Sequence, residues 1–179
     1  MKKLYLLLPI LFLIYWGCED EKDTTPTEVT LWGVVYSVED TDSLYLPYSG
    51  LTGEIPPEIG NLTNLTVLGL MSNQLSGEIP ESICDLTNLT YLNLYYNQLT
   101  GSIPPEIGNL TNLTYLSLSN NQLTGNIPES ICELTNLTWY SGFIIPTTPN
   151  SSIGNNQLCP PYPECIEDYV GVQDTSDCD

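Results

Sequence analysis

The chain is rich in carboxylates and poor in the groups that usually assist them in catalysis. Its 179 residues include 22 Asp and Glu, no His, and three basic residues, which are Lys2, Lys3 and Lys22. Catalysis through histidine is therefore excluded, and the lysine of a Walker-type phosphate loop is missing. Because nucleic-acid binding depends on Lys and Arg that neutralise phosphates, we also expect no nucleic-acid partner.

Paired carboxylates are the remaining arrangement that could do chemistry, as in glycoside hydrolysis. The candidates are Glu58 with Glu106 and Glu81 with Glu129, and each pair recurs at a fixed interval along the chain. Such repetition is typical of a solvated face and argues against a glycosidase pair. The acidic stretch 39–42 lacks a full set of calcium ligands, and zinc would need His or a C-x-x-C pair. We therefore predict no catalytic site, no metal and no cofactor.

The N-terminal residues have the pattern of an export signal. Two lysines precede an apolar run of 14 residues, Leu4 to Gly17, which is short for a spanning helix of about 20 residues. The Gly17-Cys18 pair ending the run resembles the lipobox of bacterial lipoproteins, whose cysteine is lipidated. The resemblance implies a signal peptide at 1–17, lipidation of Cys18, an acidic polar tether at 18–29, and anchoring at the outer membrane or cell surface. The alternatives are an uncleaved anchor or a plain signal with an incidental cysteine.

A repeat of constant length dominates the rest of the chain. Four segments align without a gap over residues 50–145, beginning at Gly50, Gln74, Gln98 and Gln122. The second reads QLSGEIPESICDLTNLTYLNLYYN, and the pattern L-x-x-L-x-L-x-x-N-x-L recurs from unit to unit. This pattern resembles the leucine-rich repeat. The added L-x-G-x-I-P stretch resembles its plant-type subclass, which is known from receptor-like kinase ectodomains and from secreted inhibitors of cell-wall-degrading enzymes.

The alternation within each repeat predicts the fold. In x-L-x-L-x the leucines point to one side of a strand and their neighbours to the other. We expect an α/β-type solenoid, a right-handed coil with a parallel β-sheet on its concave face and a mostly 3-10 or irregular convex side. An asparagine near the end of each pattern should turn inward, where its amide satisfies backbone groups at the bend. These residues are Asn73, Asn97, Asn121 and Asn156.

Both ends of such a stack need covers for the exposed core. Residues 30–49 are expected to form an N-terminal cap and an incomplete first repeat. Residues 146–165 are expected to hold an insertion and then the C-terminal cap. The insertion is placed within 143–154, because the next Asn-Gln-Leu, at 156–158, comes later than the constant repeat length requires. The acidic tail at 166–179 is expected to be loose.

The remaining cysteines belong to the repeats, the cap and the tail. Cys159 and Cys165 match the two cysteines that close a small loop in the plant-type C-terminal cap, so the resemblance implies a disulfide between them. Cys84 and Cys132 hold the same place two coils apart, which is about 10 Å at about 4.8 Å per coil. That exceeds the reach of a disulfide, about 7 Å, so we expect two small buried thiols. Cys178 has no assigned partner.

Aromatic residues are concentrated between the strand leucines, on the expected concave surface. No charge lies beside them, exposed Tyr and Trp are typical anchors of interfaces, and aromatic rings with nearby Asn also suit sugars. The alternative is that tyrosine favours strands and stacks along the ladder without a ligand. The candidate ligand-binding residues are Tyr45, Tyr48, Tyr91, Asn93, Tyr95, Tyr96, Tyr115, Trp139 and Phe143.

These patterns favour a non-catalytic, lipid-anchored surface module that recognises a protein or glycan through a rigid concave face. A second hypothesis, which the plant-type resemblance permits, is an inhibitor or receptor-like ectodomain that acts with cell-wall enzymes or a signalling partner. A third is a structural protein of the envelope.

Overall fold

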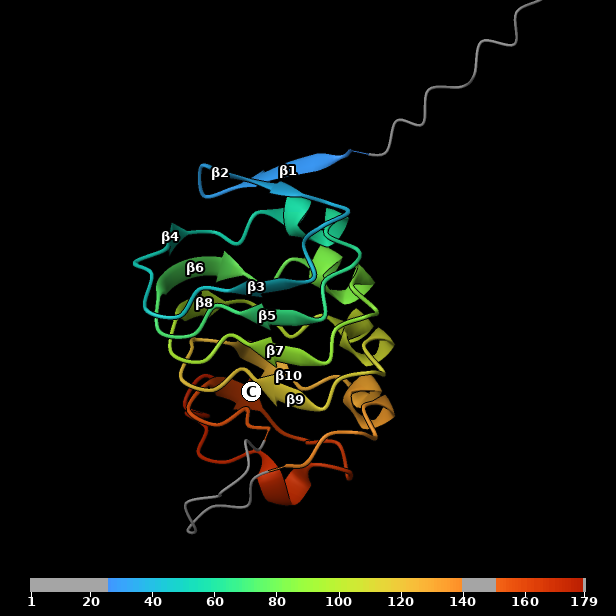
Figure 1. Ribbon diagram of the computed structural model, residues 1–179. Coiled ribbons are helices and arrows are strands. Elements are labelled where there is room, and N and C mark those ends of the chain that lie inside the picture. The colour runs from blue at the N-terminus through green and yellow to red at the C-terminus, as the bar shows by residue number, and fades with distance from the viewer. Residues whose placement is uncertain (1–25, 140–150, 179) are drawn as a thin grey trace, which may run out of the picture.

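The computed structural model describes residues 26–139 and 151–178, which form a stack of coils between two caps (Figure 1). The predicted signal peptide, Cys18 and most of the predicted tether lie outside the described residues, as does most of the predicted insertion. Within the described ranges, no helix is long and apolar enough to cross a membrane.

Short parallel strands line one side of the stack. One sheet contains β3 (Ser43–Tyr45), β5 (Val67–Gly69), β7 (Tyr91–Asn93) and β9 (Tyr115–Ser117), in that order. A second parallel sheet, which the repeat pattern did not predict, contains β4 (Thr52–Gly53), β6 (Gln74–Glu78) and β8 (Gln98–Thr100). It arises because the L-x-G segment of each repeat is also extended, and β10 (Thr124–Asn126) pairs in the same way with β11 (Gln157–Cys159).

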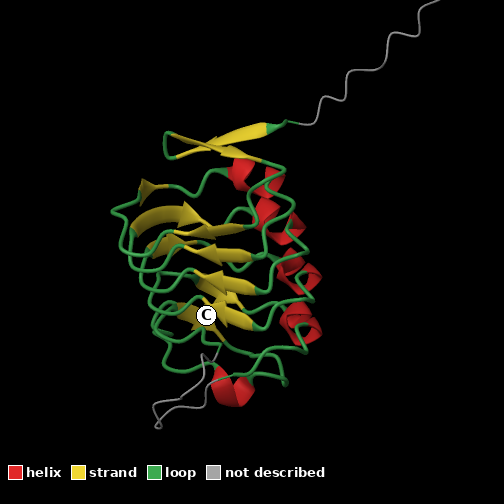
Figure 2. Cartoon of the chain, in the orientation of Figure 1, coloured by secondary structure: helices red, strands yellow, loops and turns green. Residues whose placement is uncertain are grey.

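The opposite side of each coil is a single 3-10 turn, and these turns stack on one another (Figure 2). They are η1 (Pro57–Asn61), η2 (Glu81–Asp85), η3 (Pro105–Asn109) and η4 (Glu129–Glu133). Each begins directly after a proline, because a proline keeps the isoleucine before it out of the helical region. The central Ile of each turn points into the core, where it is at most 1% exposed.

Repeated leucines and isoleucines form one continuous core. Leu68, Leu92 and Leu116, from the middle of three neighbouring strands, are fully buried and lie in register. Each such side chain contributes roughly 1.5–3 kcal/mol when removed from water. A single coil has too few of them to fold alone, so stability comes from stacking.

The repeat asparagines connect each coil to the next. The Asn121 Oδ1 accepts a hydrogen bond from the backbone N–H of Leu99 at 3.1 Å, and its Nδ2 donates to the carbonyls of Leu94 and Leu118 at 3.0 Å. Because two of these partners belong to the preceding coil, the amide ties neighbouring coils together as well as closing its own bend. The other predicted ladder residues make equivalent bonds: Asn73, Asn97 and Asn156.

Two kinds of coil alternate along the stack. Coils with the sequence PPEIG carry a glycine where the others, with PESIC, carry a cysteine. A Cβ on Gly60 would lie 2.7 Å from the Ser82 Cβ of the next coil, and a Cβ on Gly108 would meet the Ser130 Cβ at the same distance. The glycine therefore lets the following coil approach closely, and the Ser82 hydroxyl donates to the Pro57 carbonyl at 2.7 Å across this contact.

An antiparallel hairpin covers the N-terminal end of the core. Strand β1 (Glu28–Leu31) pairs with β2 (Val34–Ser37), and Val29 and Leu31 are buried against the first coil. The incomplete first repeat predicted within residues 30–49 supplies β3. The first two residues of β2, Val34 and Val35, are exposed.

The C-terminal residues form one more turn of the stack, so the prediction of a loose tail is wrong. The short helix η5 (Glu167–Tyr169) lies between two apolar side chains, Ile166 and Val170, which are 0% and 8% exposed. These side chains cover the open end of the core, which explains why an acidic segment is ordered.

Gln173 takes the place of a ladder asparagine in this last turn. Its Oε1 accepts from the Leu158 backbone N–H at 3.2 Å, and its Nε2 donates to the carbonyls of Ile153 and Val170 at 3.1 and 2.7 Å. The spacing Val170-x-x-Gln173 repeats Leu118-x-x-Asn121. That spacing is the signal by which the sequence could have revealed the terminal coil.

The predicted Cys159–Cys165 disulfide is wrong. Cys132 is bonded to Cys165, with 5.8 Å between their Cα atoms, and Cys159 is bonded to Cys178, with 5.6 Å. Cys132 belongs to the last repeat, so its thiol meets the cap instead of another repeat, and the expectation that it stays a free thiol is also wrong. The terminal coil returns Cys178 to Cys159, which is why the small cap loop is not closed on itself.

Cys84 remains a buried thiol, as predicted. It is 1% exposed, and burial, helped by the nearby carboxylates of Glu106, Asp85 and Glu81, raises the pKa of the thiol to about 12. We expect native protein to resist a thiol reagent at pH 8 and to react with it only after unfolding, because the thiolate is the reactive form. Mass spectrometry of alkylated protein, with and without denaturant, measures this. Rapid labelling of the native protein would contradict the burial of the thiol.

Candidate functional site

The parallel register places the tyrosines of successive coils in contact. Tyr91 pairs with Tyr115 in adjacent strands, and their rings stack with centroids 4.5 Å apart and planes 10° from parallel. Burial raises the pKa of the Tyr115 phenol, and the smaller, opposing effect of its hydrogen bond with Ser117 does not cancel this. These two half-buried rings thus form an uncharged platform, and much of each ring surface is used within the protein.

Tyr45 is more accessible than this pair. Its ring lies over Gly69 of the next coil, where an added Cβ would come within 2.3 Å of it, and 52% of Tyr45 is exposed. The ring centroid of Tyr45 is 6.4 Å from that of Tyr91. Glycine at position 69 therefore makes room for a ring that extends the platform toward the N-terminal cap.

Asn93 is not placed as a ligand-binding residue. It is 4% exposed, its Oδ1 accepts from the Tyr95 backbone N–H at 3.0 Å, and its Nδ2 donates to the Tyr91 hydroxyl at 2.9 Å. The amide positions two tyrosines, so it supports the aromatic residues without facing a ligand.

A second group of tyrosines lies where the chain leaves the strands. Tyr48 and Tyr96 occupy equivalent turns two coils apart, with φ angles of 51° and 56°. This left-handed conformation is unusual for a large side chain. Tyr48 is 74% exposed and Tyr96 is 60% exposed, and Tyr95 lies beside Tyr96 with ring centroids 5.9 Å apart. The same left-handed conformation recurs at the equivalent Ser72, Asn120 and Asn155, so it belongs to the repeat, and what sets Tyr48 and Tyr96 apart is the exposed aromatic ring that they place on this turn.

The two remaining candidates do not extend this surface. Trp139 is half-buried and packs against the core, and Ser151 pairs with it through a single bridge. Phe143 lies outside the described residues. We name the six remaining tyrosines the aromatic face: Tyr45, Tyr48, Tyr91, Tyr95, Tyr96 and Tyr115.

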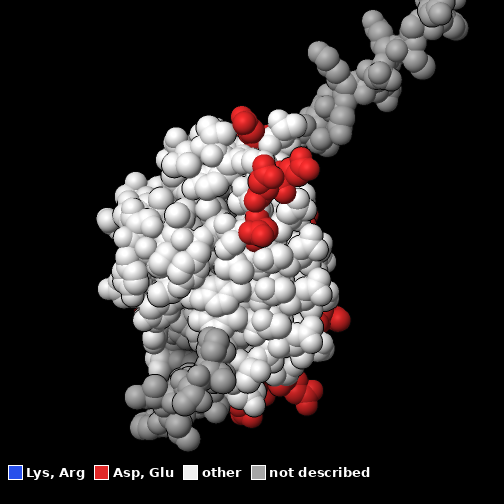
Figure 3. Space-filling model, viewed as in Figure 1, with Lys and Arg blue, Asp and Glu red and all other residues white. Residues whose placement is uncertain are grey.

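Charge is separated from the aromatic face. No Lys or Arg occurs in the described ranges, and exposed acidic residues of the N-terminal cap region include Glu28, Glu39, Asp40 and Asp42. Figure 3 shows acidic side chains at this cap and at the edges of the view, with an uncharged surface between them. No group of three or more potential metal ligands lies together in the part of the chain that the structure describes.

Stacked coils of parallel strands, joined by an asparagine ladder and closed by two caps, define a solenoid class of repeat protein, in which each repeat contacts only its neighbours. The family model described as "leucine-rich repeat region" matches residues 43–139. The chain belongs to this family.

Solved plant structures are similar to the chain. The ectodomain of the receptor kinase SOBIR1 from Arabidopsis thaliana is 33% identical, with a TM-score of 0.60, over 72% of this chain and 65% of that one. The Arabidopsis receptor kinase HAESA, solved with the peptide hormone IDA and the co-receptor SERK1, is 34% identical with a TM-score of 0.60, over 70% of this chain and 19% of that one. These matches confirm the resemblance to plant receptor ectodomains.

A plant ice-binding protein is also similar, at 38% identity and a TM-score of 0.53, over 65% of this chain and 34% of that one. The chain thus spans less than two thirds of the length of each of these three structures. No curated protein matches the sequence significantly. The two disulfides and the ectodomain neighbours favour an exported protein.

Proposed function

We propose that the protein is a non-catalytic binding module that recognises a protein or glycan through the aromatic face. The observation that carries the proposal is the pair of exposed rings on left-handed turns, Tyr48 and Tyr96. A smaller or more polar residue would suit those turns better, so a tyrosine there is explained by contact with a partner. Because the coils hold the rings in place before binding, little ordering entropy is lost when a ligand arrives.

The neighbours support peptide or protein recognition as one form of this function. HAESA was solved with a bound peptide hormone and a co-receptor, and this chain resembles part of it. A receptor-like or inhibitory role would use the same face, with the signalling or enzymatic partner supplied by another protein. If the protein instead has a structural role in the envelope, we expect it to bind no specific ligand.

The double substitution Tyr48→Asn/Tyr96→Asn tests the face without straining the backbone. Asparagine adopts the left-handed region readily, and the protein itself uses it at the equivalent Asn120 and Asn155. We expect an unchanged or higher melting temperature together with at least tenfold weaker binding to a hit from a peptide and glycan array, since two interface anchors are lost.

A matched control is Val35→Thr, which changes an exposed apolar residue on the N-terminal hairpin, away from the face. Normal binding by the double variant to an array hit would show that the face is not the site. An array without any hit would favour the structural role.

We propose in addition that Cys18 is lipidated and holds the module at the outer membrane or cell surface. The support is the Gly17-Cys18 pair after the apolar run and the polar residues that follow it. More than one acyl chain on the cysteine would give stable anchoring. Labelling with a radioactive fatty acid in the wild type and in Cys18→Ser tests this, and label retained in the variant would refute it.

A second candidate function is ice binding, which a different surface supports. The phrase L-T-N-L-T places an exposed threonine and an exposed asparagine on every repeat: Thr63, Asn64, Thr87, Asn88, Thr111, Asn112, Thr135 and Asn136. The asparagines hold their rows through bonds to the preceding coil, such as Asn112 Nδ2 to the Thr87 carbonyl at 2.9 Å. A regular, uncharged polar array with a rigid repeat could match an ordered water lattice, and a similar plant protein binds ice.

Thermal hysteresis and inhibition of ice recrystallisation test this candidate. We expect activity in the wild type and its loss in Thr87→Lys/Thr111→Lys, because two charged chains break the array. The Tyr48→Asn/Tyr96→Asn protein should keep it. Wild-type protein that behaves like an unrelated protein of equal concentration would remove ice binding from consideration.

A further inference from the structure

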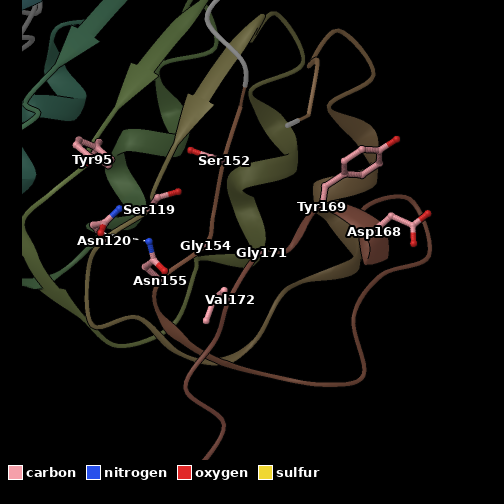
Figure 4. Close-up of a pocket in the computed structure, with 10 residues that line it drawn as sticks. All are labelled: Tyr95, Ser119, Asn120, Ser152, Gly154, Asn155, Asp168, Tyr169, Gly171 and Val172. Carbon is pink, nitrogen blue, oxygen red and sulfur yellow. Dashed lines mark hydrogen bonds between the residues drawn. The ribbon is translucent and has the colours of Figure 1, made fainter. Parts of the chain in front are cut away.

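A hollow of about 340 Å³ lies at the C-terminal end of the aromatic face (Figure 4). Its size is at the lower end of the roughly 300–1,000 Å³ that small-molecule sites occupy. Its lining comes from Tyr95, Ser119, Asn120, Ser152 and Asn155, together with residues of the terminal coil. Because the repeat pattern did not indicate that this coil is ordered, the hollow could not be foreseen from the repeats.

The hollow exists because side chains shrink from coil to coil. Tyr95, Ser119 and Gly154 follow one another at equivalent positions, as the bonds of Tyr96 N to the Ser119 carbonyl and Asn120 N to the Gly154 carbonyl show. In the terminal coil Gly171 faces Gly154, and a Cβ on Gly171 would lie 3.0 Å from the Gly154 Cα. The floor at this end is therefore bare backbone, and the Tyr95 ring bounds the hollow on the side of the aromatic face.

Ser119 presents a buried hydroxyl with no partner inside the protein. The residue is 5% exposed, and its Oγ makes no hydrogen bond within the described ranges. Leaving such a group unpaired lowers the stability of the fold, and a methyl group would fit the same space. Figure 4 shows this hydroxyl pointing away from Tyr95, on the same side as Ser152. Its retention is explained if a ligand completes its hydrogen bonding.

Two amides stand beside the hydroxyl. The Asn155 Nδ2 donates to the Asn120 Oδ1 at 3.3 Å, which leaves Asn120 with free N–H donors and Asn155 with a free carbonyl acceptor among the described residues. Ser152 shares a hydrogen bond with Ser117 at 3.1 Å. The hollow thus alternates donors and acceptors within a small space, which is the pattern that matches the hydroxyl groups of a sugar.

The interior of the hollow carries no charge. The one acidic residue of the lining, Asp168, lies at the far rim, and its side chain points away from the two amides in Figure 4, as does that of the neighbouring Tyr169. An anionic ligand would have no cation to meet, and a Lys or Arg side chain of a peptide would have no inward carboxylate. An aromatic wall with uncharged donors and acceptors favours a neutral pyranose ring instead.

We propose that this hollow binds one sugar residue of a neutral glycan, with Ser119, Asn120 and Asn155 as the hydrogen-bonding groups and Tyr95 as the apolar wall. The inference rests on the proposed function and deepens it, because it chooses glycan over peptide at this end of the face. Longer glycans extend from the hollow across Tyr96 toward Tyr48.

The experiment uses named probes and paired variants. The probes are the methyl glycosides of glucose, galactose, mannose, xylose and N-acetylglucosamine with their short oligomers, and a set of Lys- and Arg-containing peptides. The hollow variants are Ser119→Ala, which removes the unpaired hydroxyl, and Asn155→Asp, which keeps the shape but removes a donor and adds charge. The controls are Ser102→Ala and Asn109→Asp, which make the same changes at exposed residues outside the hollow.

We expect at least one neutral oligomer to bind by calorimetry and to shift the side-chain amide NMR signals of Asn120 and Asn155. Ser119→Ala and Asn155→Asp should bind it at least tenfold more weakly, while both controls bind as the wild type does. Ser119→Ala should also melt no lower than the wild type, since it loses no internal hydrogen bond. A purely structural serine would not combine unchanged stability with lost binding.

Three results would overturn the proposal. If a neutral glycan binds and only Tyr48→Asn/Tyr96→Asn weakens it, the proposed function stands and the hollow is not its sugar site. If only the cationic peptides bind, the ligand class is wrong. If no probe binds and the wider array also has no hit, both the hollow and the proposed function fail.

Discussion

Replacing Asn121 by alanine should lower the free energy of unfolding by about 3 kcal/mol, because each buried group left unpaired costs about 1 kcal/mol or more. The substitution leaves the Leu99 N–H and the carbonyls of Leu94 and Leu118 without the amide that they share. Asn121 is only 9% exposed, so water has little access to these three groups. Chemical denaturation followed by circular dichroism measures the change.

The matched control is Asn112→Ala in the same coil. Asn112 also bonds a carbonyl of the preceding coil, that of Thr87 at 2.9 Å, but it is exposed and water can take over the bond. We expect a change within about 0.5 kcal/mol, as for most surface substitutions. Equal effects of the two substitutions would show that the ladder amide has no special role in holding the coils together.

Removing the Cys132–Cys165 bridge should be about as costly. The bond closes a loop with a sequence separation of 33, and the loss of unfolded-state entropy for a loop of that length corresponds to about 4 kcal/mol. For Cys159–Cys178, with a separation of 19, the same relation gives about 3 kcal/mol. Cys132→Ser/Cys165→Ser should therefore unfold at a clearly lower denaturant concentration than the oxidised wild type.

Peptide mapping without reduction provides the independent check of this pairing. Fragments joined through Cys132 with Cys165, and through Cys159 with Cys178, are expected from wild-type protein. A fragment that joins Cys159 to Cys165 would restore the pairing implied by the plant-type cap. Reduction of the wild type should lower its stability below that of the oxidised double serine variant, since reduction also opens the Cys159–Cys178 bridge that this variant keeps.

The repeat predicted the fold because its leucines and asparagines leave few choices. The two-residue alternation around Leu92 and Leu116 places strands in register, and an asparagine such as Asn97 recurs at the bend that its amide closes. Stacked identical coils then follow from the constant length of the repeat. The 3-10 turns of the opposite side were expected for the same reason, since I-P followed by a short segment cannot form a long helix.

The C-terminal end was predicted poorly because it departs from the period. Gln173 performs the task of an asparagine with a longer side chain, so the repeat pattern does not include it. Because the prediction did not include the last coil, it gave Cys178 no partner and paired Cys159 with Cys165 instead of Cys178. The hollow beside Ser119 was missed as well, because it depends on contact between Gly154 and Gly171, which both follow the insertion and do not lie one repeat length apart.

A strand pattern in the sequence cannot distinguish aromatic residues that face a ligand from those that pack on each other. Alternation placed Tyr91, Asn93 and Tyr115 on one surface, and they are neighbours there. Whether each side chain is free to meet a ligand depends on its contacts within the protein. The Asn93 amide is hydrogen-bonded to the Tyr91 hydroxyl and the Tyr95 backbone N–H. The Tyr91 and Tyr115 rings stack on each other. The left-handed turns of Tyr48 and Tyr96 have no signature in the sequence, since other residues fill the equivalent turns of neighbouring coils.

The alternation of glycine-bearing and cysteine-bearing coils sets a rule for how this array can lengthen or shorten during evolution. The cap closes on the cysteine of the final coil, so an array ending in a PPEIG coil would offer it Gly108 and no sulfur. At the C-terminal end, adding or losing a single repeat would take away the cysteine that the cap bonds, whereas adding or losing a pair of neighbouring repeats there would keep one in the last coil. A descendant that had lost the last pair of repeats would end on the coil of Cys84. The Cys84 thiol, which is buried and unpaired in the present protein, would then hold the place of Cys132 and could bond the cap.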